Sequence, residues 1–344
     1  MPFSAMLLLR RVAAVLAAGV MFTGSEAALA QTLQVPANSA LHQVADIPMP
    51  GPPVRFDYQS FDALHGRLYI AHMNANQLVV FDVQTRKVVA NLDGFARVHG
   101  VIAVPQIDRI FASATGDHRV NVVSMSTLQI LATAGPIDYP DGLAYAPPVH
   151  RVFVSDEHGG VDAVMDTKTN KLLTSIQLGG GAGNTVYDPG SDRILVAVHK
   201  LNQLVVIDPA TMRVVNRYFL PGISDPHGIT LDQANRLAFI AGEGNHSLAV
   251  FDLRTMKILA VHQVGDDPDV LAFDPGLMRL YVAAESGMVT IFQEVNRDLN
   301  TMAQFNMPHA HTVAVDSRSH LVYFPLENVG GKPLLRIMEP IVSH

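Results

Sequence analysis

Residues Leu68–Asp82 read Leu-Tyr-Ile-Ala-His-Met-Asn-Ala-Asn-Gln-Leu-Val-Val-Phe-Asp, and a Thr-Arg-Lys-Val-Val run begins at Thr85. Two short β-branched and aromatic runs separated by Asn are typical of two strands joined by a hairpin turn. Related stretches recur at Val152–Asp166, Ile194–Asp208 and Leu237–Asp252. The recurrence predicts one structural unit that is used several times along the chain.

The repeat has a period of about 42 residues, which with four strands per unit is typical of a β-propeller blade. The last unit is short and lacks an outer strand, whereas residues 40–49, ahead of the first unit, resemble the outer strands elsewhere. We therefore predict an all-β fold, a single seven-bladed β-propeller with four-stranded antiparallel blades and a seventh blade closed by the N-terminal strand. The units begin near Arg55, Arg97, Pro140, Gly183, Pro226, Pro268 and Ala310.

The first thirty residues have the pattern of a secretory signal peptide. Arg10 and Arg11 precede an apolar stretch from Val12 to Phe22, and Ala28-Leu29-Ala30 fits the small-x-small cleavage rule. A membrane anchor is the alternative, but its apolar run falls short of the roughly 20 residues that a spanning helix needs. We expect residues 1–30 to be a signal peptide, residues 31–344 to form the propeller domain, and the mature protein to reside in the periplasm without a transmembrane segment.

Composition excludes several classes of protein. The 344 residues contain no cysteine, which rules out disulfides, thiolate metal sites and cysteine nucleophiles. The net charge of −7 gives no basic footprint, so we expect no nucleic-acid partner. We expect a monomer that binds a small-molecule ligand or a protein partner at the mouth of the central channel.

Equivalent positions in the repeats form two rings of mostly polar residues. The position that opens each innermost strand is polar in every unit, and the position about sixteen residues later is mostly acidic. Because both positions fall at the same end of a blade, we expect the two rings to surround one mouth of the channel. The inner ring is Asp57, His99, Asp141, Asn184, His227, Asp269 and His311, and the outer ring is Met73, Thr115, Glu157, His199, Glu243, Glu285 and Glu327.

Imidazoles and carboxylates that converge on one axis suit a divalent cation, with Mg, Ca, Zn, Mn and Fe all open as its identity. We expect His99, His227, His311 and Glu243 to be its ligands. His199 and Glu285 are the candidate catalytic residues that move a proton. The ligand pocket is expected to be lined by Asp57, Asp141, Asn184, Asp269, Glu157 and Glu327.

Plainer interpretations remain open at this point. Polar residues in a wet channel can simply hydrogen-bond one another and water. His99 and His227 each precede a glycine and can be turn formers. His309 and His311 are two residues apart, a spacing that would put both side chains on one side of a strand. The sequence is therefore compatible with two functions. One is a metal-dependent enzyme, either a lyase or a lactone or ester hydrolase, and the other is a non-catalytic binding propeller.

Two resemblances bear on these alternatives. The Leu-Tyr-Ile-Ala and Asn-Gln-Leu-Val-Val-Phe-Asp strands, with the following outer strand, resemble the YVTN-family, YncE-like propellers over residues 40–340. Pro226-His-Gly-Ile-Thr-Leu-Asp232 and Ala238-Phe-Ile-Ala-Gly-Glu243 resemble the repeat of streptogramin (virginiamycin B) lyases, whose axial His and Glu residues surround magnesium. This second resemblance implies cation-site roles for His227 and Glu243, with Glu285 and His311 at the corresponding later positions. That family's repeat Trp is absent here, which argues against the same substrate.

Overall fold

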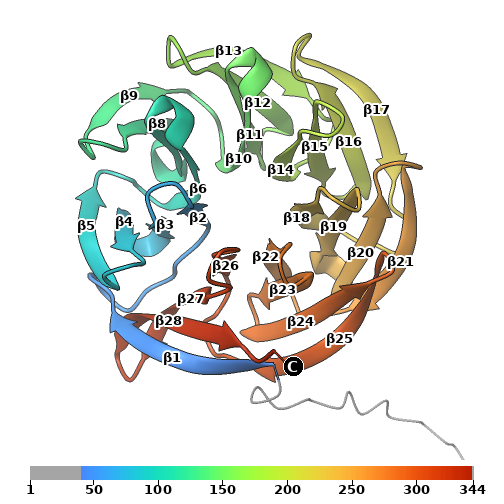
Figure 1. The fold of residues 1–344 in the computed structure, drawn as a ribbon. Helices are drawn as coiled ribbons and strands as arrows, with labels where there is room; N and C mark the ends of the chain where they lie inside the picture. The colour runs from blue at the N-terminus through green and yellow to red at the C-terminus, as the bar shows by residue number, and fades with distance from the viewer. Residues whose placement is uncertain (1–39, 343–344) are drawn as a thin grey trace, which may run out of the picture. The chain divides into compact units, whose positions relative to one another are not determined.

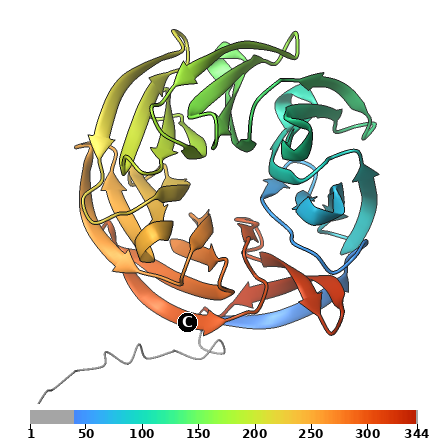
Figure 2. The ribbon, with the colours of Figure 1, turned by 180° about the vertical axis from the view of Figure 1, so that it is seen from behind.

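The computed structural model describes residues 40–342, so the predicted signal peptide and cleavage site lie outside the described residues. The described chain forms seven four-stranded antiparallel sheets arranged in a ring, with one strand of each sheet next to the centre (Figures 1 and 2). The predicted seven-bladed propeller is confirmed. No helix in this part of the chain is long and apolar enough to cross a membrane.

The blades follow one another along the chain, each running from the innermost to the outermost strand. Blade 1 is β2 (Gln59–Asp62), β3 (Arg67–His72), β4 (Gln77–Asp82) and β5 (Lys87–Asp93); blade 2 is β6 (Val98–Val104), β7 (Arg109–Ala114), β8 (Arg119–Ser124) and β9 (Ile130–Ala134). Blade 3 is β10 (Pro140–Ala146), β11 (Arg151–Asp156), β12 (Val161–Asp166) and β13 (Lys171–Gln177); blade 4 is β14 (Ala182–Asp188), β15 (Arg193–Val198), β16 (Gln203–Asp208) and β17 (Arg213–Phe219). Blade 5 is β18 (Pro226–Asp232), β19 (Leu237–Gly242), β20 (Ser247–Asp252) and β21 (Lys257–Gln263); blade 6 is β22 (Pro268–Asp274), β23 (Arg279–Ala284), β24 (Met288–Val295) and β25 (Asp298–Asn306). Short 3₁₀ turns connect some strands: η2 (Met73–Ala75), η3 (Pro105–Ile107), η4 (Thr115–Asp117), η5 (Pro147–Val149) and η6 (Glu243–Asn245).

Blade 7 is built from both ends of the chain. Its inner strands are β26 (Ala314–Val315), β27 (Val322–Val329) and β28 (Lys332–Pro340), and its outermost strand is β1 (Leu41–Pro48). β1 pairs antiparallel with β28 from Leu41 opposite Pro340 to Pro48 opposite Leu334 (Figure 1). The predicted closure by the N-terminal strand is confirmed, and it removes the free edge that an open blade would present.

An Asp at the end of the third strand shapes the hairpin that follows in several blades. Asp82 Oδ1 accepts hydrogen bonds of 2.8 Å from both the backbone N–H and the hydroxyl of Thr85. Arg86 then takes a left-handed conformation with φ of 54°. In blade 2, Ser124 replaces the Asp, and its hydroxyl accepts the N–H of Thr127 at 3.2 Å. The replacement therefore preserves the turn.

Apolar side chains fill the space between neighbouring blades. Phe239 of blade 5, for example, packs in one cluster with Leu280 and Phe292 of blade 6, and all three are fully buried. Burying each such side chain contributes about 1.5–3 kcal/mol. Because similar clusters lie between other blades, the innermost strands are held in fixed positions around the axis.

Glycines after inner-ring residues allow the blades to approach closely. A Cβ atom at Gly100 would collide with the carbonyl oxygen of Asp141, and one at Gly228 would collide with that of Asp269. His99 and His227 lie within strands β6 and β18, so the alternative that they are turn formers is wrong. The His-Gly pairs serve blade-to-blade contact near the axis instead.

Candidate functional site

The two predicted rings meet at one mouth of the propeller. The backbone N–H of an outer-ring residue bonds the carbonyl two residues before the inner-ring residue of the same blade, as in Glu157 to Tyr139 (3.1 Å) and Glu243 to Asp225 (3.1 Å). A cavity of about 250 Å³ opens there. From the rings it is lined by Asp57, His99, Asp141, His227, Asp269, Met73, Glu157, Glu243 and Glu285.

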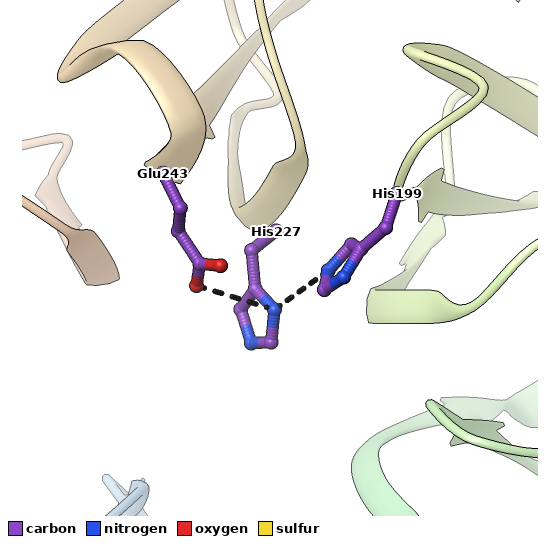
Figure 3. Close-up of side chains that lie close together, drawn as sticks. All are labelled: His199, His227 and Glu243. Atoms are coloured by element: carbon purple, nitrogen blue, oxygen red, sulfur yellow. Dashed lines mark hydrogen bonds and ion pairs between the residues drawn. The ribbon is translucent and has the colours of Figure 1, made fainter.

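Three side chains from blades 4 and 5 converge at this mouth and form the His199 group: His199, His227 and Glu243 (Figure 3). His199 Nε2 lies 2.9 Å from His227 Nδ1, and Glu243 Oε1 lies 3.3 Å from the same nitrogen. His199 follows β15, His227 lies on β18 and Glu243 opens η6, so each side chain starts from a fixed strand end. Two imidazole nitrogens and a carboxylate this close together are suited to a cation.

The electrostatics of the His199 group favour bound positive charge. Burial lowers the pKa of His227, but Glu243, Asp269 and Asp141 outweigh burial and raise it to about 9. Burial, together with His227, lowers the pKa of His199 to about 4, so His199 is neutral at pH 7. Burial raises the pKa of Glu243 to about 7, against the effect of His227. A proton therefore occupies His227 when nothing else supplies the positive charge.

A second convergence, the His311 group, consists of Asp57, Asp269 and His311. His311 Nε2 lies 3.7 Å from Asp57 Oδ1 and 3.5 Å from Asp269 Oδ2. All three residues are buried. Asp57 and His311 lie just before β2 and β26, whereas the sequence placed them at the strand starts.

His99 belongs to neither group, so the structure does not gather His99, His227 and His311 around one point. Its Nε2 is 3.1 Å from the hydroxyl of Tyr139 and 3.9 Å from Asp57 Oδ2. Its Nδ1 bonds the carbonyl of Arg97 at 2.7 Å. Burial lowers the pKa of His99, which keeps this imidazole neutral at pH 7.

The candidate proton-transfer residue Glu285 lines the cavity in an ion pair. Its Oε1 lies 2.7 Å from the guanidinium of Arg55, which also stands 3.8 Å from Asp57 Oδ2. The pair places Glu285 beside the carboxylates of the axis without joining either cation group.

The remaining predicted pocket residues occupy different environments. Asp141 and Glu157 face the cavity, with Asp141 Oδ2 3.5 Å from His227 Nε2. Asn184 lies against Gly142 of the neighbouring blade, where a Cβ would collide with its side-chain oxygen. Glu327 instead bonds His309 at 2.8 Å.

His309 and His311 do not share one side of a strand. Both precede β26, and His309 has a φ of 68°. The left-handed residue turns the chain between them, so His309 reaches Glu327 while His311 faces Asp57 and Asp269. The two imidazoles therefore have different partners, and the expectation that they share one side of a strand is wrong.

Tyr58 is an important site residue that the repeat pattern did not single out. Its hydroxyl lies 3.0 Å from His227 Nε2 and 3.1 Å from Asp269 Oδ1, so blade 1 is linked to blades 5 and 6 through the centre. Because a carboxylate only accepts, the hydroxyl donates to Asp269 and accepts from His227 Nε2–H. His227 Nδ1 is then the nitrogen that faces His199 and Glu243. A comparison of the residues that directly follow the inner-ring positions would have singled out Tyr58, which follows Asp57.

Comparisons with known proteins establish the fold alone. No protein-family model matches the chain, and no curated protein matches it. Hydrazine synthase of Kuenenia stuttgartiensis has a similar structure, with a TM-score of 0.69 over 88% of this chain and 97% of that chain. The two sequences are only 16% identical, so the similarity is one of propeller architecture.

Proposed function

We propose that this chain is a periplasmic, monomeric propeller that binds a divalent cation at the His199 group and a small molecule in the cavity that His227 and Glu243 line. The observation that carries the proposal is the approach of His199 Nε2 and Glu243 Oε1 to the same nitrogen of His227. The bond from His227 Nε2 to Tyr58 supports it, because a ligating imidazole usually anchors its other nitrogen. The resemblance of the His227 and Glu243 segments to streptogramin lyases, within a YVTN-like repeat, points the same way.

The chemistry that best suits this mouth is lyase or lactone and ester hydrolase chemistry. A divalent cation bound there supplies polarisation of a substrate oxygen. Glu285 lines the cavity and pairs through Oε1 with Arg55 at 2.7 Å, and its carboxylate is the candidate proton acceptor. His199 loses its role as a base in this scheme because its Nε2 faces the cation position. The excess of carboxylates around the cavity attracts a cation, and with it a substrate that is bound to the cation.

Cation binding is tested on untagged, full-length mature protein. Dialysis against Mn²⁺ or Zn²⁺ followed by elemental analysis should show bound metal, and His227→Ala should lose the cation of the His199 group. Metal-free wild-type protein that stays folded would overturn the proposal. N-terminal sequencing of the protein from a periplasmic fraction checks the expected cleavage after Ala30.

A non-catalytic binding propeller is the second candidate. It is favoured by side chains that already satisfy one another, such as Arg55 with Glu285, His309 with Glu327 and Tyr139 with His99. A panel of lactones and esters, assayed with and without chelator, separates the two candidates. Chelator-sensitive turnover that Glu285→Gln abolishes supports the enzyme, and ligand binding without turnover supports the scaffold.

A further inference from the structure

We propose that the His311 group binds a second divalent cation, so that the mouth of the propeller is a two-cation centre. The side chains of Asp57, Asp269 and His311 are 2%, 6% and 9% exposed, whereas the Glu243 side chain of the His199 group is 24% exposed. The second site is thus the more buried of the two. Its existence does not depend on the first, but its use in a reaction rests on the proposed function.

Unmet hydrogen-bonding capacity marks the second site. Within the described residues, neither His311 Nε2 nor Asp57 Oδ1 has a hydrogen-bond partner, although both atoms are buried. Buried polar atoms are almost always paired, and an unpaired one commonly marks the place of an ion or water. Here the two unpaired atoms lie 3.7 Å apart, so a single bound ion would be a partner for both.

The spacing of the three ligand atoms matches a shared cation better than a hydrogen bond. The distances of 3.7 Å and 3.5 Å from His311 Nε2 exceed the usual hydrogen-bond length. Ligand atoms at about 2.0–2.2 Å from a tetrahedral metal are about 3.3–3.6 Å apart. Two carboxylates and a neutral imidazole also carry the charge that a divalent cation balances, and one nitrogen with two oxygens suits Mn²⁺ or Zn²⁺.

Asp269 connects the two cation positions. Its Oδ2 faces His311, while its Oδ1 accepts the Tyr58 hydroxyl at 3.1 Å and lies 3.4 Å from His227 Nε2. One carboxylate therefore contacts a member of each group through a different oxygen. Arg55 neutralises the other side of the second site, because it approaches Asp57 at Oδ2 and leaves Oδ1 to the cation.

The test is a titration of full-length mature protein with Mn²⁺, followed by calorimetry and elemental analysis. We expect two Mn²⁺ per chain in the wild type, and one in either Asp57→Asn or His199→Gln. His99→Gln is the matched control. His99 lies close to Asp57 as His311 does, at 3.9 Å, but it belongs to neither group, so the variant should keep both ions. His311→Gln serves in place of Asp57→Asn if that variant does not fold.

The outcomes separate the two proposals. One ion that disappears in His199→Gln and persists in Asp57→Asn overturns the second site and leaves the proposed function intact. One ion with the reverse pattern overturns the first site only. A wild type that binds no Mn²⁺ overturns both sites. A His311 imidazole that stays doubly protonated in ¹⁵N spectra at saturating Zn²⁺ overturns the second site.

Discussion

Replacing Tyr58 with Phe removes one hydroxyl and two hydrogen bonds at the centre of the ring. His227 Nε2 loses its partner at 3.0 Å, and Asp269 Oδ1 loses its donor at 3.1 Å. Loss of the group that anchors a ligating imidazole lowers metal affinity about 10- to 100-fold, or about 1.4–2.7 kcal/mol. His227 Nε2 and Asp269 Oδ1 remain 3.4 Å apart without the hydroxyl between them, so the free energy of unfolding should also fall, by about 1–3 kcal/mol.

Calorimetric Mn²⁺ titration and urea unfolding measure these two effects separately. Tyr139→Phe is the matched control, because its hydroxyl makes the same contact of 3.1 Å with a histidine, His99, outside both cation groups. We expect its Mn²⁺ affinity to stay within about twofold of wild type. Equal affinity in Tyr58→Phe and wild type, or an equal loss in both variants, would refute the anchoring role of Tyr58.

Three further predictions concern stability. Burial and the adjoining Asp232 carboxylate raise the pKa of Glu294 from 4.5 to about 8. Between these two pH values the folded chain holds a proton that the unfolded chain has lost, so the free energy of unfolding falls as pH rises. Glu294→Gln should flatten that fall in melting temperature against pH, and an unchanged slope would contradict it. Arg236→Ala breaks the two-bond pairing with Asp188 that ties blade 5 to blade 4, and urea unfolding should register a loss of about 3 kcal/mol. Leu41→Ala, at a side chain 1% exposed in β1, should cost about 2–5 kcal/mol, with hydrogen exchange accelerated first in β1 and β28; acceleration spread evenly over all blades would argue against it.

The repeat made the fold and the two rings predictable, because blade structure follows the alternation of strands and turns within about 42 residues. Closure by β1 was readable for the same reason. The division of the candidate ligands into two separate groups could not be predicted from the repeat. His99 and His227 hold the same ring position, yet His99 contacts Tyr139, just before the inner strand of the next blade, whereas His227 contacts Tyr58 of blade 1. A pattern that repeats along the chain does not show which residues meet across the central axis.

The separation of His309 from His311 shows a second reason. The left-handed residue that changes the direction of the chain is His309 itself, where Gly or Asn would be the usual residue, so the sequence does not indicate this conformation. The ion pairs could not be predicted either. Nothing near Glu285 in the sequence indicates that Arg55 of the first blade is its partner.

Closure of the ring by both ends of the chain has a consequence for maturation. Asp57 precedes the inner strand of the first blade and His311 precedes that of the last, so they become neighbours only after β1 has joined β28. A cation held between them would load only onto finished molecules. By mass action it would also hold the two ends together, since a ligand that binds only the closed form stabilises that form. Metal supply would then set how long the folded molecule survives, as well as whether it works.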